Sequence, residues 1–228
     1  MAPRRVGRPW VSAAREATGA PTPGRADAWR RAATAASADR LELAAAVLCG
    51  GRSRRMGQDK ALMLLDGQPM ARRVADAALA AGAVSVVALG GDPEALASIE
   101  LTCRPDDHPG DGPLPAVVAA LRECSTEVLL VVPCDLVAPS SAAMAATARA
   151  LVEEPSADLA VPVDGAGRRQ WAHAAWRRRA AARLAASVAA GSRSLAEAAA
   201  SLTVVDVAGL DPAALRDADR PEELPGAG

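Results

Sequence analysis

From Leu43 onward, the chain alternates short continuous apolar runs with longer segments whose apolar residues recur every three or four positions. Continuous apolar runs are typical of strands buried on both faces of a sheet, and the longer period is typical of helices. The predicted strands are Leu43–Leu48, Ser85–Leu89, Leu101–Arg104, Val128–Val132, Leu159–Val163 and Thr203–Val207, with Trp171–Trp176 as a further candidate. The predicted helices are Pro69–Ala81, Pro93–Ile99, Leu114–Glu123, one capped by Ser140 or Ser141 that runs to Glu153, Arg177–Ala190 and Ser194–Leu202.

This alternation predicts an α/β fold, a single domain with a mostly parallel sheet flanked by helices. In such sheets, ligands bind beyond the carboxyl ends of the strands. We therefore expect the loop after Leu48, the turn at Gly90 and the side chain of Asp135 to meet at one crevice.

The charges are unevenly distributed along the sequence. Residues 1–40 carry eight arginines against three acidic residues, a balance of +5, which leaves −6 for the rest of a chain whose net charge is −1. Residues 1–40 are predicted to be a basic, disordered N-terminal extension, and residues 41–228 the folded domain. An acidic body argues against a nucleic-acid partner. No apolar run reaches the ~20 residues of a membrane span, so no membrane association is predicted.

The composition narrows the chemistry further. The chain has no Phe or Tyr, so its core must be built from Ala, Val and Leu, and ligand stacking on tyrosine is excluded. The four cysteines have no CxxC spacing and lie in or beside apolar stretches: Cys49, Cys103, Cys124 and Cys134. This pattern predicts reduced, buried thiols in a cytoplasmic protein rather than a disulfide or zinc framework.

Lys60 is the one lysine among 26 Lys and Arg residues, and it ends the glycine- and arginine-rich segment that starts at Cys49. Lysine is a compact point charge, whereas arginine is a broad planar fork. A lysine kept in such a loop, near the backbone N–H groups of Gly50 and Gly51, indicates a phosphate cradle. The loop lacks the spacing of a P-loop or of a GxGxxG fingerprint.

The apolar run Val128–Val132 is followed by Pro133, Cys134 and then Asp135. An unpaired carboxylate at the end of a buried strand is costly. A bound Mg²⁺ would neutralise this carboxylate and bridge it to phosphate oxygens, whereas capping of the next turn is the alternative role. Because Asp135 and the cationic loop are expected at the same end of the sheet, together they predict a magnesium–nucleotide site.

Four segments of the sequence form one ordered pattern: Leu48–Ala61 followed by Gly67 and Pro69, Asp107–Leu114, Val132–Asp135, and Asp217–Leu224. In this order they resemble the signature of the MobA-like family of nucleotidyltransferases, the molybdenum cofactor guanylyltransferases. The resemblance covers about residues 43–225, and the first segment is highly specific. It implies a GT-A-like, Rossmann-like nucleotidyltransferase fold.

The resemblance also implies a role for individual residues. The nucleotide would be bound by Leu48, Cys49, Gly50, Gly51, Lys60, Gly90, Asp107 and Asp135. Lys60, Asp135 and Arg55 would be the catalytic charges, because they would neutralise the triphosphate and the metal. Asp135 would hold Mg²⁺, with Asp217 or Asp219 as a second carboxylate, and Asp219 is taken as that metal ligand. Gln170 would lie on the acceptor side.

The implied reaction is the transfer of GMP from GTP to molybdenum-bound molybdopterin, with release of pyrophosphate. The implied partners are GTP, the molybdopterin acceptor and other proteins of molybdenum cofactor synthesis. A relative that uses CTP, or a sugar-phosphate acceptor, is the alternative, and a non-catalytic nucleotide-binding module is a third hypothesis. The chain departs from the family pattern by Cys49 in place of alanine, Arg220 in place of threonine, and the absence of asparagine.

Three other features are interpreted as structural. His108 lies in a turn and is predicted to face solvent, whereas His173 is predicted to pack in the interior. Cys134 is interpreted as a core residue. The run Arg177–Arg179 is interpreted as the solvated start of a helix, with an anionic acceptor as the alternative contact.

Overall fold

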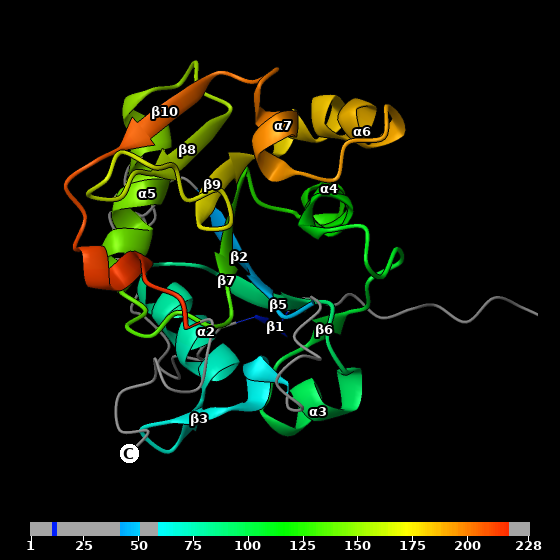
Figure 1. The fold of residues 1–228 in the computed structure, drawn as a ribbon, viewed down its shortest axis with the longest axis vertical. Helices are drawn as coiled ribbons and strands as arrows, with labels where there is room; N and C mark the ends of the chain where they lie inside the picture. The colour runs from blue at the N-terminus through cyan, green and yellow to red at the C-terminus, as the bar shows by residue number, and fades with distance from the viewer. Residues whose placement is uncertain (1–10, 13–41, 51–58, 219–228) are drawn as a thin grey trace, which may run out of the picture.

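The computed structural model describes residues 11–12, 42–50 and 59–218. In this part of the chain, helices cover both faces of an eight-stranded sheet (Figure 1). The strands of that sheet are β1 (Val11–Ser12), β2 (Leu43–Leu48), β5 (Ser85–Leu89), β6 (Cys103–Arg104), β7 (Val128–Pro133), β8 (Leu159–Pro162), β9 (Ala174–Arg177) and β10 (Val204–Val207). The α-helices are α2 (Met70–Ala80), α3 (Pro93–Ser98), α4 (Pro113–Glu123), α5 (Ser141–Glu153), α6 (Ala181–Ala189) and α7 (Leu195–Ala199).

The strands follow the order β1-β5-β2-β7-β9-β8-β10, and β6 also pairs with β5. The central strand β2 is parallel to β5 and to β7, and β10 is parallel to β8. The main part of the sheet changes direction at β9, which is antiparallel to both β7 and β8. The predicted fold class, a mostly parallel sheet flanked by helices, is confirmed.

The apolar runs form strands because both faces of the sheet are buried. Val47 and Val132 pack on the side of α2, α3 and α5. Ala46 and Val131 point to the opposite side, toward α4, α6 and α7. Figure 1 shows these two layers on either side of the sheet. Every position of such a strand must be apolar, which is why the sequence shows continuous runs and no alternation.

The predicted extension, residues 1–40, lies outside the described residues except for β1. This strand pairs with Ser85 and Val86 of β5 in the antiparallel direction.

Two predictions for the segment that contains β9 are wrong. The strand begins at Ala174, not at Trp171, and it ends at Arg177, where a solvated helix start was expected. The side chain of Arg177 is buried, and its guanidinium donates to the carbonyl oxygens of Ala157 (2.9 Å) and Leu151 and pairs with Glu127. Arg177 therefore satisfies backbone acceptors inside the fold, and the helix starts only after the short 3₁₀ helix η3 (Arg178–Ala180).

The sequence analysis missed a small hairpin formed by β3 (Leu64–Leu65) and β4 (Gln68–Pro69). The two residues between these strands, Asp66 and Gly67, both have positive φ angles, 55° and 77°. Asp-Gly is a strong signal for a two-residue hairpin turn, so the sequence contained the information needed to find it.

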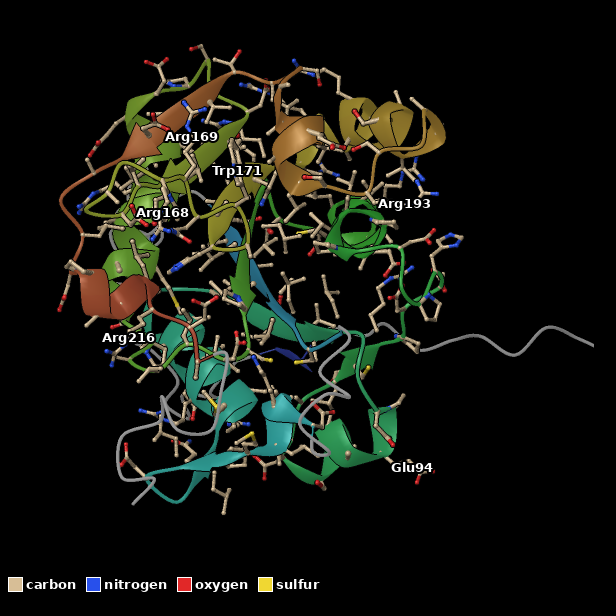
Figure 2. The ribbon with its side chains drawn as sticks, in the orientation of Figure 1. Glu94, Arg168, Arg169, Trp171, Arg193 and Arg216 are labelled. Carbon is tan, nitrogen blue, oxygen red and sulfur yellow. The ribbon has the colours of Figure 1, made fainter. Side chains whose placement is uncertain are left out.

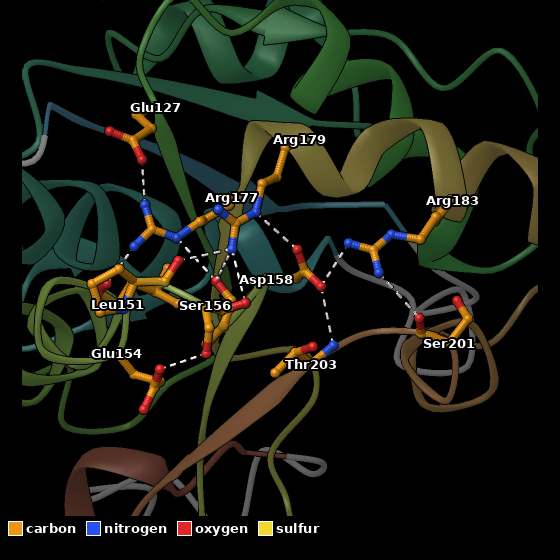
Figure 3. Close-up of polar contacts among 12 residues, drawn as sticks. Glu127, Leu151, Glu154, Ser156, Asp158, Arg177, Arg179, Arg183, Ser201 and Thr203 are labelled. Carbon is orange, nitrogen blue, oxygen red and sulfur yellow. Dashed lines mark hydrogen bonds and ion pairs between the residues drawn. The ribbon is translucent and has the colours of Figure 1, made fainter.

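A buried carboxylate ties three elements together at the amino-terminal end of β8 (Figure 3). Asp158 is 1% exposed and accepts hydrogen bonds from Nε of Arg179 (2.9 Å) and the backbone N–H of Thr203 (3.0 Å). Arg183 forms an ion pair with its second oxygen at 2.7 Å. Burial alone would raise the pKa of Asp158, but the bonds from Thr203, Arg179 and Arg183 lower it below its usual value. The ionised carboxylate thus links β8 to α6 and β10.

Replacing Asp158 by alanine is expected to destabilise the fold by about 2–3 kcal/mol, because a buried N–H and two cations lose their acceptor. Urea unfolding at neutral pH measures this loss. Glu153→Ala is the matched control, since Glu153 pairs with Arg149 on an exposed helix face and such a pair contributes ~0.5 kcal/mol or less. Equal midpoints for the two variants would contradict the role assigned to Asp158.

His173 is buried just before β9, which confirms its predicted interior position, whereas His108 is exposed as predicted. Neither ring nitrogen of His173 has a hydrogen-bond partner among the described residues. Burial lowers the pKa of His173 from its ordinary 6.5 to about 4. The imidazole is therefore neutral at physiological pH, and protonating it inside the core is unfavourable.

This depressed pKa predicts acid sensitivity. The unfolded chain binds a proton at His173 below pH 6.5, whereas the folded protein resists it until about pH 4. The contribution of neutral His173 to the free energy of unfolding is fully present above pH 6.5. It is lost as the pH falls to about 4, by roughly 3 kcal/mol in total. Urea midpoints measured from pH 7.5 to 4.5 should fall less steeply in His173→Leu than in the unmodified protein. Parallel pH profiles would exclude His173 as the cause.

Candidate functional site

The carboxyl ends of β2, β5 and β7 meet at one edge of the sheet, as the sequence predicted. The backbone N–H groups of Cys49 and Gly50 both donate to the carbonyl oxygen of Leu89, each at 2.9 Å. On the other side of β2, the N–H of Cys134 donates to the carbonyl oxygen of Leu48 at 3.2 Å. The residues that follow the three strands are thus held side by side by main-chain bonds.

The glycine turn after β5 packs directly on the backbone after β2. Gly90 and Gly91 have φ angles of 72° and 88°, which side chains rarely tolerate. A Cβ on Gly90 would lie 2.8 Å from the Cα of Gly50, and one on Gly91 would lie 2.9 Å from a methyl group of Leu96. The positive φ favours glycine at both positions, and Gly90 needs it additionally because its backbone touches that of Gly50.

The lysine and the aspartate that the sequence singled out are in contact. The Nζ of Lys60 lies 3.1 Å from Oδ2 of Asp135 and donates to the carbonyl oxygen of Ala218 at 2.8 Å. Both side chains are mostly buried, with exposures of 12% for Lys60 and 16% for Asp135. Lys60 begins the 3₁₀ helix η2 (Lys60–Leu62), which is capped by the side chain of Asp59 through the N–H of Ala61.

The closing acidic segment reaches the same place. Asp217 forms an antiparallel bridge with Leu136, the residue after Asp135. The N–H of Ala218 donates to the carbonyl oxygen of Asp135 at 2.9 Å, and the N–H of Val137 donates to that of Arg216 at 3.0 Å. Asp217 is therefore brought beside the metal-ligand candidate. The other predicted residues of this edge, Gly51, Arg55 and Asp219, lie outside the described residues.

Asp107, predicted to contact the base or ribose, is exposed and bonded to Arg104. Its Oδ2 lies 2.8 Å from a guanidinium nitrogen of Arg104, whose hydrogen bond and charge lower the pKa of Asp107. The neighbouring Asp106 lies closer to the glycine turn, because a Cβ on Gly90 would be 3.8 Å from the Cβ of Asp106. The sequence analysis missed Asp106, because the sequence does not show which of two adjacent aspartates lies nearer the glycine turn.

Gln170 lies in the wall of a cleft of about 580 Å³. Its Nε2 donates to Oδ2 of Asp164 at 3.0 Å. The cleft is bordered by the connection between β8 and β9 and by the segment after η4 (Pro212–Leu215), and it includes Asp217. The cleft that contains Gln170 thus extends to the segment that pairs beside Asp135.

The thiols of the site are poor nucleophiles. All four cysteines are free, and Cys49, Cys124 and Cys134 are buried as predicted, whereas Cys103 is half-buried. The hydrogen bond with Cys134 and burial raise the pKa of the Cys49 thiol well above its usual value. A neutral, buried thiol does not react readily, so the strand-end cysteines serve as packing groups.

The carboxylate oxygens at this edge of the sheet fit a hard cation that is bound mainly by the phosphates of a substrate. The described residues contain no group of three or more metal-ligating side chains. Asp135, with Asp217 brought nearby, nevertheless suits Mg²⁺, which is commonly held by one or two carboxylates while substrate phosphates and water complete its shell.

A parallel α/β sheet whose strand ends carry a glycine turn, a buried lysine and a carboxylate defines a nucleotide-binding α/β protein. Residues 45–203 match the family described as "MobA-like NTP transferase domain", and the chain belongs to this family. Within the described residues, no helix combines the length and apolar character needed to cross a membrane.

Two curated relatives have informative names. The chain is 38% identical to a "Probable molybdenum cofactor guanylyltransferase" of Pelotomaculum thermopropionicum over 128 residues, 55% of this chain and 59% of the relative. It is 41% identical to the "Molybdenum cofactor guanylyltransferase" of Xanthomonas euvesicatoria pv. vesicatoria over 91 residues, 40% of this chain and 45% of the relative. The chain spans about half the length of the curated relatives it matches.

Solved structures share the fold. One is the molybdopterin-guanine dinucleotide biosynthesis protein A of Archaeoglobus fulgidus, with a TM-score of 0.56, 23% identity, and coverage of 72% of this chain and 82% of that chain. A nucleotidyl transferase of Methanothermobacter has a TM-score of 0.60 and 19% identity, with coverage of 77% and 91%. These similarities establish the nucleotidyltransferase fold.

Gly90→Ala is expected to disrupt the strand-end contact, because its Cβ would meet backbone atoms of Gly50 that cannot move aside. We expect a loss of about 2–4 kcal/mol in stability and at least about tenfold weaker nucleotide binding, measured by urea unfolding and calorimetry. Gly209→Ala is the control: its φ of 78° is similarly positive, but nothing lies within 4 Å of the added Cβ. If both variants behaved alike, backbone strain alone would account for the effect.

Proposed function

We propose that this chain transfers GMP from GTP to molybdenum-bound molybdopterin and releases pyrophosphate, which yields the guanine dinucleotide form of the cofactor. The observation that carries the proposal is the Lys60–Asp135 contact, 3.1 Å long, at the strand ends beside Gly50 and Gly90. Support also comes from family membership and from the names of the relatives.

In this proposal, the nucleotide lies over the carboxyl ends of β2 and β5. The backbone from Leu48 through Cys49 and Gly50 to Gly51 contacts it, Gly90 lines the base, and Asp107 or its neighbour Asp106 contacts the base or ribose. The main-chain bonds to Leu89 support this arrangement, because they hold the two backbones rigidly before any ligand arrives.

The proposed reaction needs no covalent intermediate. A phosphate oxygen of the acceptor attacks the α-phosphorus of GTP in line, and the bond from that phosphorus to the bridging oxygen of the β-phosphate breaks. The electron pair leaves with pyrophosphate. Lys60, helped by Arg55, turns toward the triphosphate and stabilises the charge that develops on it. The site therefore works by alignment and charge neutralisation.

Asp135 is the proposed ligand of Mg²⁺, with Asp217 or Asp219 as a second carboxylate. When bound, the ion would supply positive charge to the phosphate oxygens. Its presence would also release Lys60 from its contact with Asp135, because the carboxylate would then have another counterion. The proposed partners are GTP, the molybdopterin acceptor and other proteins of molybdenum cofactor synthesis, and the proposed location is the cytoplasm, where the free thiols stay reduced.

The alternative function is a nucleotidyl transfer that uses CTP or a sugar-phosphate acceptor on the same fold. A structural neighbour supports this alternative: a CMP:2-keto-3-deoxy-manno-octonic acid synthetase solved with CTP has a TM-score of 0.54 and 14% identity. Binding of the four nucleoside triphosphates separates the two functions.

Lys60→Ala is expected to lower the rate of nucleotidyl transfer by about 10²–10³-fold, because one electrostatic donor to the phosphates is lost. Calorimetry with GTP, CTP, ATP and UTP, each with Mg²⁺, should show preferential GTP binding in the unmodified protein and its loss in the variant. Lys60→Arg retains the charge but not the compact head, so we expect it to restore binding only in part.

Arg149→Ala is the control, since Arg149 is an exposed arginine on α5 that pairs only with Glu153 among the described residues. Nearly full activity of Lys60→Ala would overturn the phosphate role of Lys60. A preference for CTP or UTP would replace GTP by another nucleotide in the proposed reaction.

A further inference from the structure

The cleft beside Gln170 carries three arginines against two aspartates on its wall: Arg168, Arg169, Arg216, Asp164 and Asp217. None of the four candidate segments that resemble the family includes the three arginines. Figure 2 shows Arg168 on the connection between β8 and β9 and Arg216 just after η4. The cleft thus collects cations from two segments far apart in sequence.

Two of the three arginines already have counterions. Arg168 lies 2.9 Å from Oδ2 of Asp164. Arg169 binds both carboxylate oxygens of Asp206, at 2.7 and 3.1 Å, and its guanidinium lies 5.5 Å from the ring centre of Trp171. These pairs lock the loop in place and leave little positive charge for a ligand.

Arg216 differs from them. Its backbone is fixed, because its carbonyl oxygen accepts from the N–H of Val137 at 3.0 Å. Its side chain is exposed in the cleft wall and has no hydrogen bond or ion pair among the described residues. A guanidinium on a rigid backbone, whose donors no described residue occupies, is suited to bind a phosphate with two parallel hydrogen bonds.

The position of Arg216 connects the cleft to the proposed chemistry. The next residue, Asp217, pairs with Leu136, which follows Asp135. The cleft that Arg216 lines therefore extends to the segment beside Asp135, so a phosphate held by Arg216 would lie in a cleft that adjoins the proposed nucleotide site.

We infer that Arg216 binds the phosphomonoester of the acceptor and that this cleft is the acceptor site. The inference rests on the proposed function and adds a residue that determines acceptor affinity. Gln170 contributes to the same site: its Nε2 is occupied by Asp164, so its amide oxygen can accept from an N–H group of a heterocycle such as a pterin. Arg216 is a binding residue, because the attacking phosphate itself supplies the nucleophile.

The test uses Arg216→Ala, Arg216→Lys and the control Arg149→Ala. Arg149 is equally a surface arginine but lies on α5, outside the cleft. The probe is a pterin phosphomonoester, titrated by calorimetry with and without a GTP analogue whose α,β-bridging oxygen is replaced by a methylene group. This analogue fills the nucleotide site, so the probe cannot bind there.

Arg216→Ala should weaken probe binding at least about tenfold, because two charge-assisted hydrogen bonds are lost. Arg216→Lys should lie between, since it keeps the charge but not the fork. Arg149→Ala should match the unmodified protein, and the affinity for the GTP analogue should be the same in all four proteins. In the transfer reaction, Arg216→Ala should raise the KM for molybdopterin while the KM for GTP stays unchanged.

Equal probe binding in Arg216→Ala and the unmodified protein would overturn the inference. Weaker binding of the GTP analogue in Arg216→Ala would also overturn it, because the residue would then serve the nucleotide. Failure of the proposed function is distinguished by the analogue alone: if the unmodified protein does not bind it, the guanylyl reaction is wrong. In that case, the titration without the analogue still decides the role of Arg216. Probe binding that weakens in Arg216→Ala supports the acceptor cleft, and probe binding that stays the same refutes it.

Discussion

The parallel pairing of β2 with β5 and β7 is the constraint on which the rest of the site depends. In register, Leu48 faces Leu89 on one side and Pro133 on the other. All three strands therefore end at the same level, and the loops that follow them leave the sheet together. A shift of one residue in β7 would exchange the two faces of that strand, so each side chain would pack against the wrong helix layer, and it would also move Asp135 away from Lys60. The hydrophobic core and the charged site are thus set by the same register.

The contact between Lys60 and Asp135 shows how the free protein tolerates two ionised groups in a mostly buried place. Each side chain is the counterion of the other, and Lys60 also has the carbonyl oxygen of Ala218 as an acceptor. A nucleotide with its cation would exchange this internal pair for two new ones, phosphate with lysine and metal with carboxylate. In the proposed reaction, each of these two side chains would therefore keep an opposite charge beside it.

Much of the fold could be predicted from the sequence, because a short continuous apolar run between turn residues is typical of a strand buried on both faces. Leu43–Leu48 and Ser85–Leu89 form strands with the predicted bounds. The direction of β9 could not be predicted, since strand pairing depends on partners distant in sequence. The burial of Arg177 also escaped prediction, because a run of arginines looks solvated until the backbone carbonyls around it are known. At the site, Lys60, Gly50, Gly90 and Asp135 meet as expected, whereas the cleft arginines carried no motif.

The contact of Lys60 with the carbonyl oxygen of Ala218 spans 158 residues of sequence. During synthesis, the lysine and the strand-end glycines leave the ribosome long before the segment that completes their surroundings. The contacts of Lys60 cannot reach their final geometry until Ala218 has emerged and paired with Asp135. Nucleotide capture would then report that the whole domain has folded, and a chain that stalls earlier would not hold a triphosphate in an incomplete site.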